Sequence, residues 1–128
     1  MTQFSNEKYN LEERTARFGE EIIRFCKLVA QDVISKPIIA QLIRSATSIG
    51  ANYCEANCAS SKKDFANKIF ICKKEAQETR HWLRMVANCA GDMNLELAIL
   101  NDECQQLIFI FQKITNSLRN KIENSKIE

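Results

Sequence analysis

The sequence contains little glycine and proline and only one histidine. Three Gly and one Pro in 128 residues are too few for the many tight turns of a β-sandwich or barrel, and no stretch resembles a flexible linker. No uninterrupted apolar run approaches the roughly 20 residues that a membrane-spanning helix needs. The single histidine, His81, rules out any metal site that requires a pair of His ligands. These absences exclude turn-rich β folds and favour a helical chain without a membrane span.

Cysteine, by contrast, is frequent. Six cysteines would form a disulfide framework in a short secreted protein. The first ten residues, MTQFSNEKYN, are polar and lack the apolar core of a signal peptide, so we expect reduced thiols and a cytoplasmic protein. Cys54 and Cys58 have a spacing that could supply half of a metal site, but the other four cysteines are scattered along the chain. Cysteines in apolar stripes act more often as small hydrophobic side chains, and we expect no metal site and no cofactor.

Apolar periodicity and stop signals predict four helices. Asn10 is followed three residues later by Glu13, which is the spacing of a capping box at the start of a helix. Ser61 and Asp64 repeat this spacing. The residue before Pro37 avoids helical angles, which places a break there. The predicted helices span about residues 11–34, 38–59, 62–90 and 95–122, and the tail to residue 128 is expected to fray.

The third and fourth predicted helices carry apolar residues at alternating spacings of three and four, the heptad pattern of packed helices. Long helices joined by short turns must fold back on their neighbours. We therefore predict an all-α fold, an antiparallel up-down-up-down four-helix bundle, as a single domain over residues 1–128. A continuous coiled coil is the alternative, but Pro37 and Gly91 interrupt it. The predicted core stripes are Phe65, Ile69, Cys72, Ala76, Thr79, Leu83, Val86 and Ala90, and Leu97, Leu100, Cys104, Leu107, Phe111, Ile114 and Leu118.

The predicted second helix has almost no charge. Between Pro37 and Ser61 only Arg44 and Glu55 are charged, and many of the other side chains are small. Because a solvated helix usually has a charged face, another element or another subunit should cover this one. Four apolar residues of the third helix fall outside its core seam and predict an association surface, unless the first or fourth helix covers them. They are Phe70, Ile71, Trp82 and Met85.

The two charges of the second helix should have partners. Arg44 and Glu55 lie eleven residues apart, which returns to nearly the same face after three turns. An unpaired buried charge is costly. If the turn near residues 60–63 joins two antiparallel helices, a residue of the second helix and a residue of the third lie at the same height when their numbers sum to roughly 123. We therefore predict that Arg44 pairs with Glu75 or Glu78. By the same register Glu55 pairs with Lys68. Contact of Arg44 and Glu55 with a ligand is the alternative.

Between Leu42 and Leu83 the chain carries an ordered series of motifs: Arg44-Ser45-Ala46-Thr47-Ser48-Ile49-Gly50-Ala51-Asn52, Glu55-Ala56, Lys63-Asp64-Phe65, Lys74-Glu75-Ala76, Glu78-Thr79 and Trp82-Leu83. This series strongly resembles the 23S rRNA intervening-sequence protein family of bacterial four-helix bundles. The resemblance implies a homopentamer without known enzymatic activity. A related protein, the accessory subunit of diversity-generating retroelements, is a basic pentamer that binds a reverse transcriptase and nucleic acid. Asn57, where the family often has Gly, affects only the local helix end.

Charge is unevenly distributed along the chain, although the net charge is only +2. Residues 62–84 hold seven basic and three acidic residues, whereas residues 85–112 hold four acidic residues and no Lys or Arg. Clustered cations attract phosphates by counterion release without reading sequence, and several subunits would multiply the cluster. An ordinary solvated helix face is the alternative. The candidate nucleic-acid-binding residues are Lys62, Lys73, Arg80 and Arg84 on one flank of the third helix, with Lys63 and Lys74 on the next.

The sequence contains no catalytic motif. His81 has no local motif that would make it part of a Cys–His dyad. Glu78 and His81 form one Glu-x-x-His pair, but the second pair of a di-iron bundle is missing, and so is a glycine-rich phosphate loop. We therefore expect a non-enzymatic homo-oligomer that binds RNA or DNA through a basic face of the third helix, with a reverse transcriptase or another protein as a further partner. The alternative is a protein-binding scaffold without a nucleic-acid role.

Overall fold

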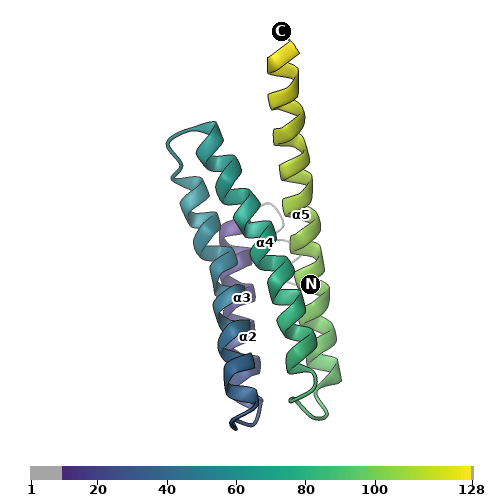
Figure 1. The fold of residues 1–128 in the computed structure, drawn as a ribbon. Helices are drawn as coiled ribbons and strands as arrows, with labels where there is room; N and C mark the ends of the chain where they lie inside the picture. The colour runs from purple at the N-terminus through teal and green to yellow at the C-terminus, as the bar shows by residue number, and fades with distance from the viewer. Residues whose placement is uncertain (1–9, 128) are drawn as a thin grey trace.

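The computed structural model describes residues 10–127, which form four α-helices that run alternately up and down (Figure 1). The predicted antiparallel four-helix bundle is confirmed. The described residues contain no strand, and none of their helices is long and apolar enough to cross a membrane. The polar first nine residues and Glu128 lie outside the described part, as do the expectations that concerned them. The helices are α2 (Leu11–Leu28), α3 (Ser35–Asn57), α4 (Lys62–Val86) and α5 (Asn94–Ile127).

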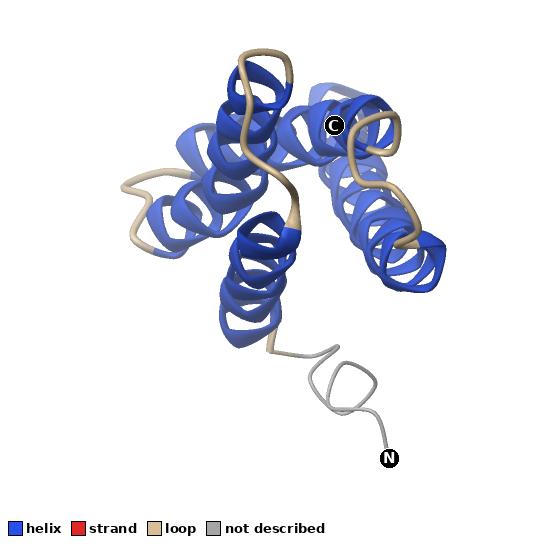
Figure 2. Ribbon diagram, turned by 90° about the horizontal axis from the view of Figure 1, so that it is seen from below, coloured by secondary structure: helices blue, strands red, loops and turns tan. Residues whose placement is uncertain are grey.

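Helices that follow one another in the sequence are neighbours in space. α3 lies between α2 and α4, and α4 lies between α3 and α5. The contact between α2 and α5 closes the bundle and is much smaller than the other three (Figure 2). The C-terminal part of α5 extends beyond the other helices (Figure 1). The bundle is therefore least tightly closed along its α2–α5 side.

The heptad stripes form the core, as predicted. All the stripe residues of residues 65–90 are buried except Phe65, which is half-buried. On α5 the stripe is buried from Leu97 to Phe111 and becomes half-buried at Ile114 and Leu118. The stripe residues become more exposed there because α5 extends beyond the other helices, so fewer side chains surround its last turns.

The junction between α2 and α3 differs from the prediction. α2 ends at Leu28 rather than near residue 34, and α3 begins at Ser35 rather than at residue 38. The break is made by Asp32, whose carboxylate accepts hydrogen bonds from the backbone N–H groups of Ser35 (2.8 Å) and Ile34 (2.9 Å). Ser35 Oγ accepts one in return from the Asp32 N–H (2.9 Å), which completes a capping box. Pro37 then occupies the first turn of α3, where its missing N–H costs nothing.

The C-terminal ends of α3, α4 and α5 also differ from their predicted positions. α3 ends at Asn57 and α4 at Val86, two and four residues early. The Asn88 side-chain amide donates to the carbonyl groups of Arg84 and Met85, which satisfies two acceptors at the end of α4. α5 continues to Ile127 instead of ending near residue 122, since it contains no Gly or Pro. The Ser61 cap is confirmed, because its Oγ accepts from the Asp64 N–H at 3.0 Å.

The side of α3 that faces away from the core is only partly covered by other helices in the described part of the chain: Thr47 and Ala51 line a groove with α2, and Arg44 pairs with Glu75 and Glu78 of α4. Arg44, Thr47 and Ala51 are exposed there. The inner side of the helix packs closely on α2, where a Cβ on Gly50 would lie 3.3 Å from Thr15 Oγ1. Of the two expected ways to cover this charge-poor helix, cover by other helices of the same chain is therefore present but incomplete at these positions.

Candidate anion-binding groove

A groove of about 720 Å³ runs between α4 and α5. Two arginines, two side-chain amides and one imidazole supply its polar groups, and no Asp or Glu is among the residues that line it. The small side chain of Ala87 and the buried side chain of Leu83 leave room between the helices. The lining residues are Gln77, Arg80, His81, Leu83, Arg84 and Ala87 from α4, and Asn101 and Ile108 from α5.

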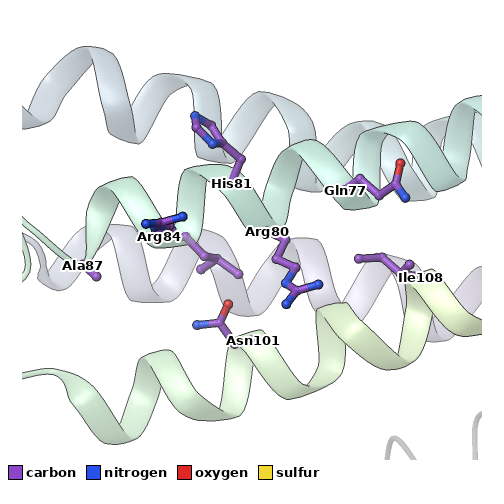
Figure 3. Close-up of a pocket in the computed structure, with 8 residues that line it drawn as sticks. Gln77, Arg80, His81, Arg84, Ala87, Asn101 and Ile108 are labelled. Atoms are coloured by element: carbon purple, nitrogen blue, oxygen red, sulfur yellow. The ribbon is translucent and has the colours of Figure 1, made fainter.

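The polar groups of the groove come from facing flanks of the two helices. Arg80 and Arg84 are four residues apart, so they lie one above the other on the same side of α4. Figure 3 shows Arg80 reaching from α4 towards α5, and Asn101 reaching from α5 towards α4. The His81 ring lies on the other side of the α4 ribbon in this view, at the edge of the groove. The groove thus presents guanidinium and amide donors to whatever occupies it.

The arginines of the groove differ from most other arginines of the bundle. Arg14, Arg17, Arg24 and Arg44 each form an ion pair with a glutamate. Among the residues whose side chains are described, no carboxylate forms an ion pair with Arg80 or Arg84. Both side chains are exposed. Their charge is therefore not neutralised within the bundle and is available to an external anion.

The other four basic candidates lie along α4 outside the groove. Lys62 and Lys73 share the flank of Arg80, nearer the start of the helix. The Lys73 ammonium lies 5.8 Å from the centre of the Phe70 ring, which is within cation–π range. Lys63 and Lys74 are exposed on the outward side. The structure thus brings two of the six candidates into the groove, and nucleic-acid binding by any of them stays a prediction.

The amides of the groove were missed by the sequence-based prediction. Gln77 lies between two candidate lysines and the candidate arginines in the sequence, and this position is the only sequence signal that indicates a place in the groove. Asn101 lies on α5, in a segment that has only acidic charges. It reaches the groove because of the register between α4 and α5, and no local motif in the sequence shows that register.

The polar pairs expected between α3 and α4 are present within one chain. Arg44 Nη1 lies 3.0 Å from Glu75 Oε2, and Arg44 Nη2 lies 2.6 Å from Glu78 Oε2. Lys68 Nζ lies 3.2 Å from Glu55 Oε2. The hydrogen bond from Arg44 lowers the pKa of Glu78, and the same bond raises the pKa of Arg44. The Arg44 side chain is 45% exposed and the Glu75 side chain 10%, so the predicted partners meet in a pair that is only partly buried.

The four apolar residues expected at an association surface have different surroundings. Phe70 is 52% exposed. Ile71, Trp82 and Met85 are half-buried. Trp82 packs against the hydrophobic core, and its ring meets the His81 ring edge-on at 5.0 Å. Phe70 therefore offers the most accessible apolar surface of the four, and a role in association stays a prediction for all of them.

The cysteines are free thiols and do not come together as a metal site. Burial raises the pKa of Cys26 to about 11 and those of Cys72 and Cys104 to about 12. Cys54 and Cys58 are exposed. Across residues 10–127, no group of three or more His, Cys, Asp or Glu side chains could hold a metal ion.

Comparison with known proteins finds a family model and a solved structure that are similar to this chain. A family model described as 23S rRNA-intervening sequence protein matches residues 7–113. The chain is also similar to the crystal structure of a protein with unknown function from the S23 ribosomal protein family of Bacteroides thetaiotaomicron, with a TM-score of 0.72 and 29% sequence identity. That similarity covers 81% of this chain and 96% of the other. No curated protein matches the chain.

Proposed function

The chain belongs to the 23S rRNA-intervening sequence protein family, and on this premise we propose that it is a non-enzymatic, self-associating cytoplasmic protein that binds RNA or DNA through the groove between α4 and α5. One observation carries the binding proposal. Arg80 and Arg84 line a groove without carboxylates, and no described side chain forms an ion pair with either of them.

The chemistry of the groove suits a phosphate backbone. A guanidinium group donates two parallel hydrogen bonds to phosphate oxygens, and two such groups one helical turn apart can hold neighbouring phosphates. The amides of Gln77 and Asn101 add donors and acceptors for phosphate and sugar oxygens. Because these contacts reach the backbone rather than base edges, binding is expected to be independent of sequence and strongly dependent on salt.

Self-association is the second part of the proposal. Four large apolar side chains on α4 and α5 are more than half exposed, which is typical of a surface that another protein covers. A subunit number of five is what the resemblance to the family implies, and several copies would repeat the groove around one assembly. The four side chains are Phe70, Leu95, Ile99 and Phe109.

The binding proposal is tested by reversing the two charges of the groove. We expect the Arg80→Glu/Arg84→Glu variant to lose most of its affinity for a structured RNA and for duplex DNA. We expect the plot of log association constant against log salt concentration to become less steep, its slope decreasing in magnitude by about 2. The association constants are measured by fluorescence anisotropy between about 50 and 200 mM salt. The control is Lys27→Glu/Lys36→Glu, which makes the same charge change at two exposed lysines outside the groove.

The outcomes separate the two function classes. Equal losses in both variants would show that net charge, rather than the groove, governs binding. A wild-type protein that binds neither nucleic acid at low salt would favour the alternative of a protein-binding scaffold. That alternative is supported by three exposed aliphatic side chains around the α2–α3 junction, Leu28, Val33 and Ile34, with exposures of 69%, 88% and 68%.

A further inference from the structure

A second groove lies between α4 and α5, beside the candidate anion-binding groove. It measures about 330 Å³. One aromatic ring, that of Phe70, and one arginine, Arg119, line it, and its single acidic residue is Glu123. The candidate anion-binding groove has a similar composition, with the His81 ring and two arginines. Both of these grooves thus place an aromatic ring near a guanidinium group.

The two grooves follow one another along the same side of the α4–α5 contact, and we call them together the α4–α5 track. On each helix, three of the lining residues recur at intervals of seven, so they share nearly the same face. The 3.2 Å hydrogen bond from the Cys104 thiol to the Ala76 carbonyl oxygen sets the antiparallel register, in which the two series are level to within a helical turn. The series are Arg84, Gln77 and Phe70 on α4, and Asn101, Ile108 and Thr115 on α5.

Positive charge extends along the track. Lys73 lies between the two grooves, and its ammonium is 5.8 Å from the centre of the Phe70 ring. Together with the three arginines it makes four basic residues, which meet one acidic residue, Glu123. Among the residues whose side chains are described, none of the four basic residues forms an ion pair. Asp102 on α5 is close in sequence, but it accepts a hydrogen bond from Gln106 at 2.9 Å. The track therefore attracts a polyanion along its length.

The two rings of the track are accessible. Phe70 is 52% exposed, and His81 is exposed as well. The His81 and Trp82 rings meet edge-on at an interplanar angle of 75°, so Trp82 covers at most one face of the imidazole. Eleven residues separate Phe70 from His81, which is about 16 Å along the helix and close to the same face. The rings thus offer two stacking positions on one side of α4, with cations between them.

Exposed rings with cations between them are the arrangement by which proteins hold single strands, whose bases are free to stack on side chains. Bases inside a duplex stack on one another and do not reach such rings. We propose that the track binds single-stranded RNA or DNA, with unpaired bases stacked on the Phe70 and His81 rings and the intervening phosphates held by the basic residues. The interval between the rings corresponds to about five stacked nucleotides at about 3.4 Å each. This inference rests on the proposed function and specifies the form of nucleic acid that the site takes.

Phe70 is also one of the four exposed apolar side chains that support self-association. It differs from the other three in its surroundings. Leu95, Ile99 and Phe109 lie on α5 outside both grooves of the track, whereas Phe70 lines one of them and contacts Lys73. A single strand on Phe70 therefore leaves the three α5 side chains available for contact with another subunit.

The test removes each ring without changing the basic residues. The probes are a fluorescein-labelled strand of about 12 deoxythymidines and a duplex of the same length, with affinities from fluorescence anisotropy. Phe70→Leu and His81→Leu should each weaken binding of the single strand roughly fivefold or more. Duplex affinity should stay within about twofold, because contacts to its phosphates are unchanged. The matched control is Phe109→Leu, at a ring that is 60% exposed and outside the track, and it should bind both probes like the wild type.

Variants that keep a ring separate stacking from loss of apolar surface. Phe70→Trp and His81→Tyr should bind the single strand like the wild type, since each still presents an aromatic face. Ultraviolet crosslinking of the wild type to the deoxythymidine strand, followed by mass spectrometry, should place crosslinks at Phe70 and His81. Crosslinks confined to residues outside the track would overturn the inference. Circular dichroism checks that every variant stays helical.

The remaining outcomes separate this inference from the proposed function. If the Arg80→Glu/Arg84→Glu variant loses affinity for both probes while Phe70→Leu and His81→Leu lose none, the proposed function stands and the stacking of bases is wrong. A wild type that binds neither probe at low salt would overturn both. If Phe70→Leu changes sedimentation equilibrium but not affinity for the single strand, Phe70 belongs to a protein contact and the inference is wrong. If it changes both, His81→Leu decides, because His81 is not among the side chains that support self-association.

Discussion

Arg14 on α2 and Glu103 on α5 form a buried ion pair held by two hydrogen bonds, from Nε to Oε2 at 2.8 Å and from Nη2 to Oε1 at 2.7 Å. The two side chains are only 2% and 4% exposed. Arg14 Nη2 also donates to Gln106 Oε1 at 2.8 Å. The α2–α5 contact is the smallest between neighbouring helices, so this pair is placed where it sets how α5 closes the bundle.

Breaking this pair from one side should be far more damaging than removing it whole. Glu103→Leu leaves the Arg14 charge buried without a counter-charge, which should cost about 3–5 kcal/mol of unfolding free energy. The double variant Arg14→Met/Glu103→Leu removes both charges and should recover most of that loss. Urea unfolding followed by circular dichroism measures the difference. Equal destabilisation of the single and double variants would mean that lost packing, rather than the unpaired charge, dominates.

The exposed pair at Arg44 should contribute much less. Because solvent reaches its guanidinium, we expect Arg44→Ala to cost about 1 kcal/mol or less. Arg44 lowers the pKa of Glu78, so the stabilisation is present above the pKa of Glu78 in the unfolded chain and is lost as pH falls through the lowered folded pKa. The gap between wild type and Arg44→Ala should therefore shrink in acid. Urea midpoints over a pH series test this, and a gap independent of pH would contradict it.

Thiol reactivity should follow burial. Cys72 and Cys104, with pKa values raised to about 12, should resist maleimide in the native protein, whereas Cys54 and Cys58 should react. Partial burial and the neighbouring Glu12 carboxylate raise the pKa of Cys54. Glu12→Gln should therefore speed the labelling of Cys54, with Cys58 as the internal reference. Mass spectrometry of timed samples gives the site-specific rates, and rapid native labelling of Cys104 would contradict the buried placement.

Two phenylalanines on α5 test the orientation of that helix. Phe111 is fully buried and Phe109 is 60% exposed. Phe111→Ala should cost about 3–5 kcal/mol by opening a cavity. Phe109→Ala should change the stability of the monomer by less than about 0.5 kcal/mol. Denaturation at a concentration below self-association isolates the monomer, and similar losses in the two variants would be inconsistent with this orientation.

The capping box at the start of α3 predicts that a substitution of Asp32 destabilises the first turn of this helix. Asp32→Ala removes the acceptor for the N–H groups of Ser35 and Ile34, so the urea midpoint should fall and the first turn of α3 should exchange its amide hydrogens faster. The N–H groups of Ser35 and Ile34 lower the pKa of Asp32, so this contribution also disappears as pH falls through that pKa. Unchanged hydrogen exchange in Asp32→Ala would assign the helix start to Pro37 instead.

Much of the bundle could be predicted from local patterns. The stripes on α4 and α5 identified the buried residues because the period of a helix fixes which side chains share a face. The register across the turn at Ser61 predicted the partners of Arg44, since a short antiparallel connection keeps numbering and height in step. The predicted helix ends were wrong in two places. The break before α3 was misplaced because Ser35, in place of the usual Glu or Gln, completes the capping box of Asp32. The end of α4 was placed too late because Asn88 satisfies two carbonyl groups there.

The sequence by itself determined the four helices and the buried stripes of α4 and α5, because both depend on residues within a few positions of one another. It also showed where charge gathers along the chain. Only the tertiary structure decided which distant groups meet. Arg14 and Glu103 are 89 residues apart, and their pairing depends on α2 and α5 closing the bundle side by side. The groove of Arg80, Arg84 and Asn101 likewise follows from the register of α4 against α5, which no local pattern encodes.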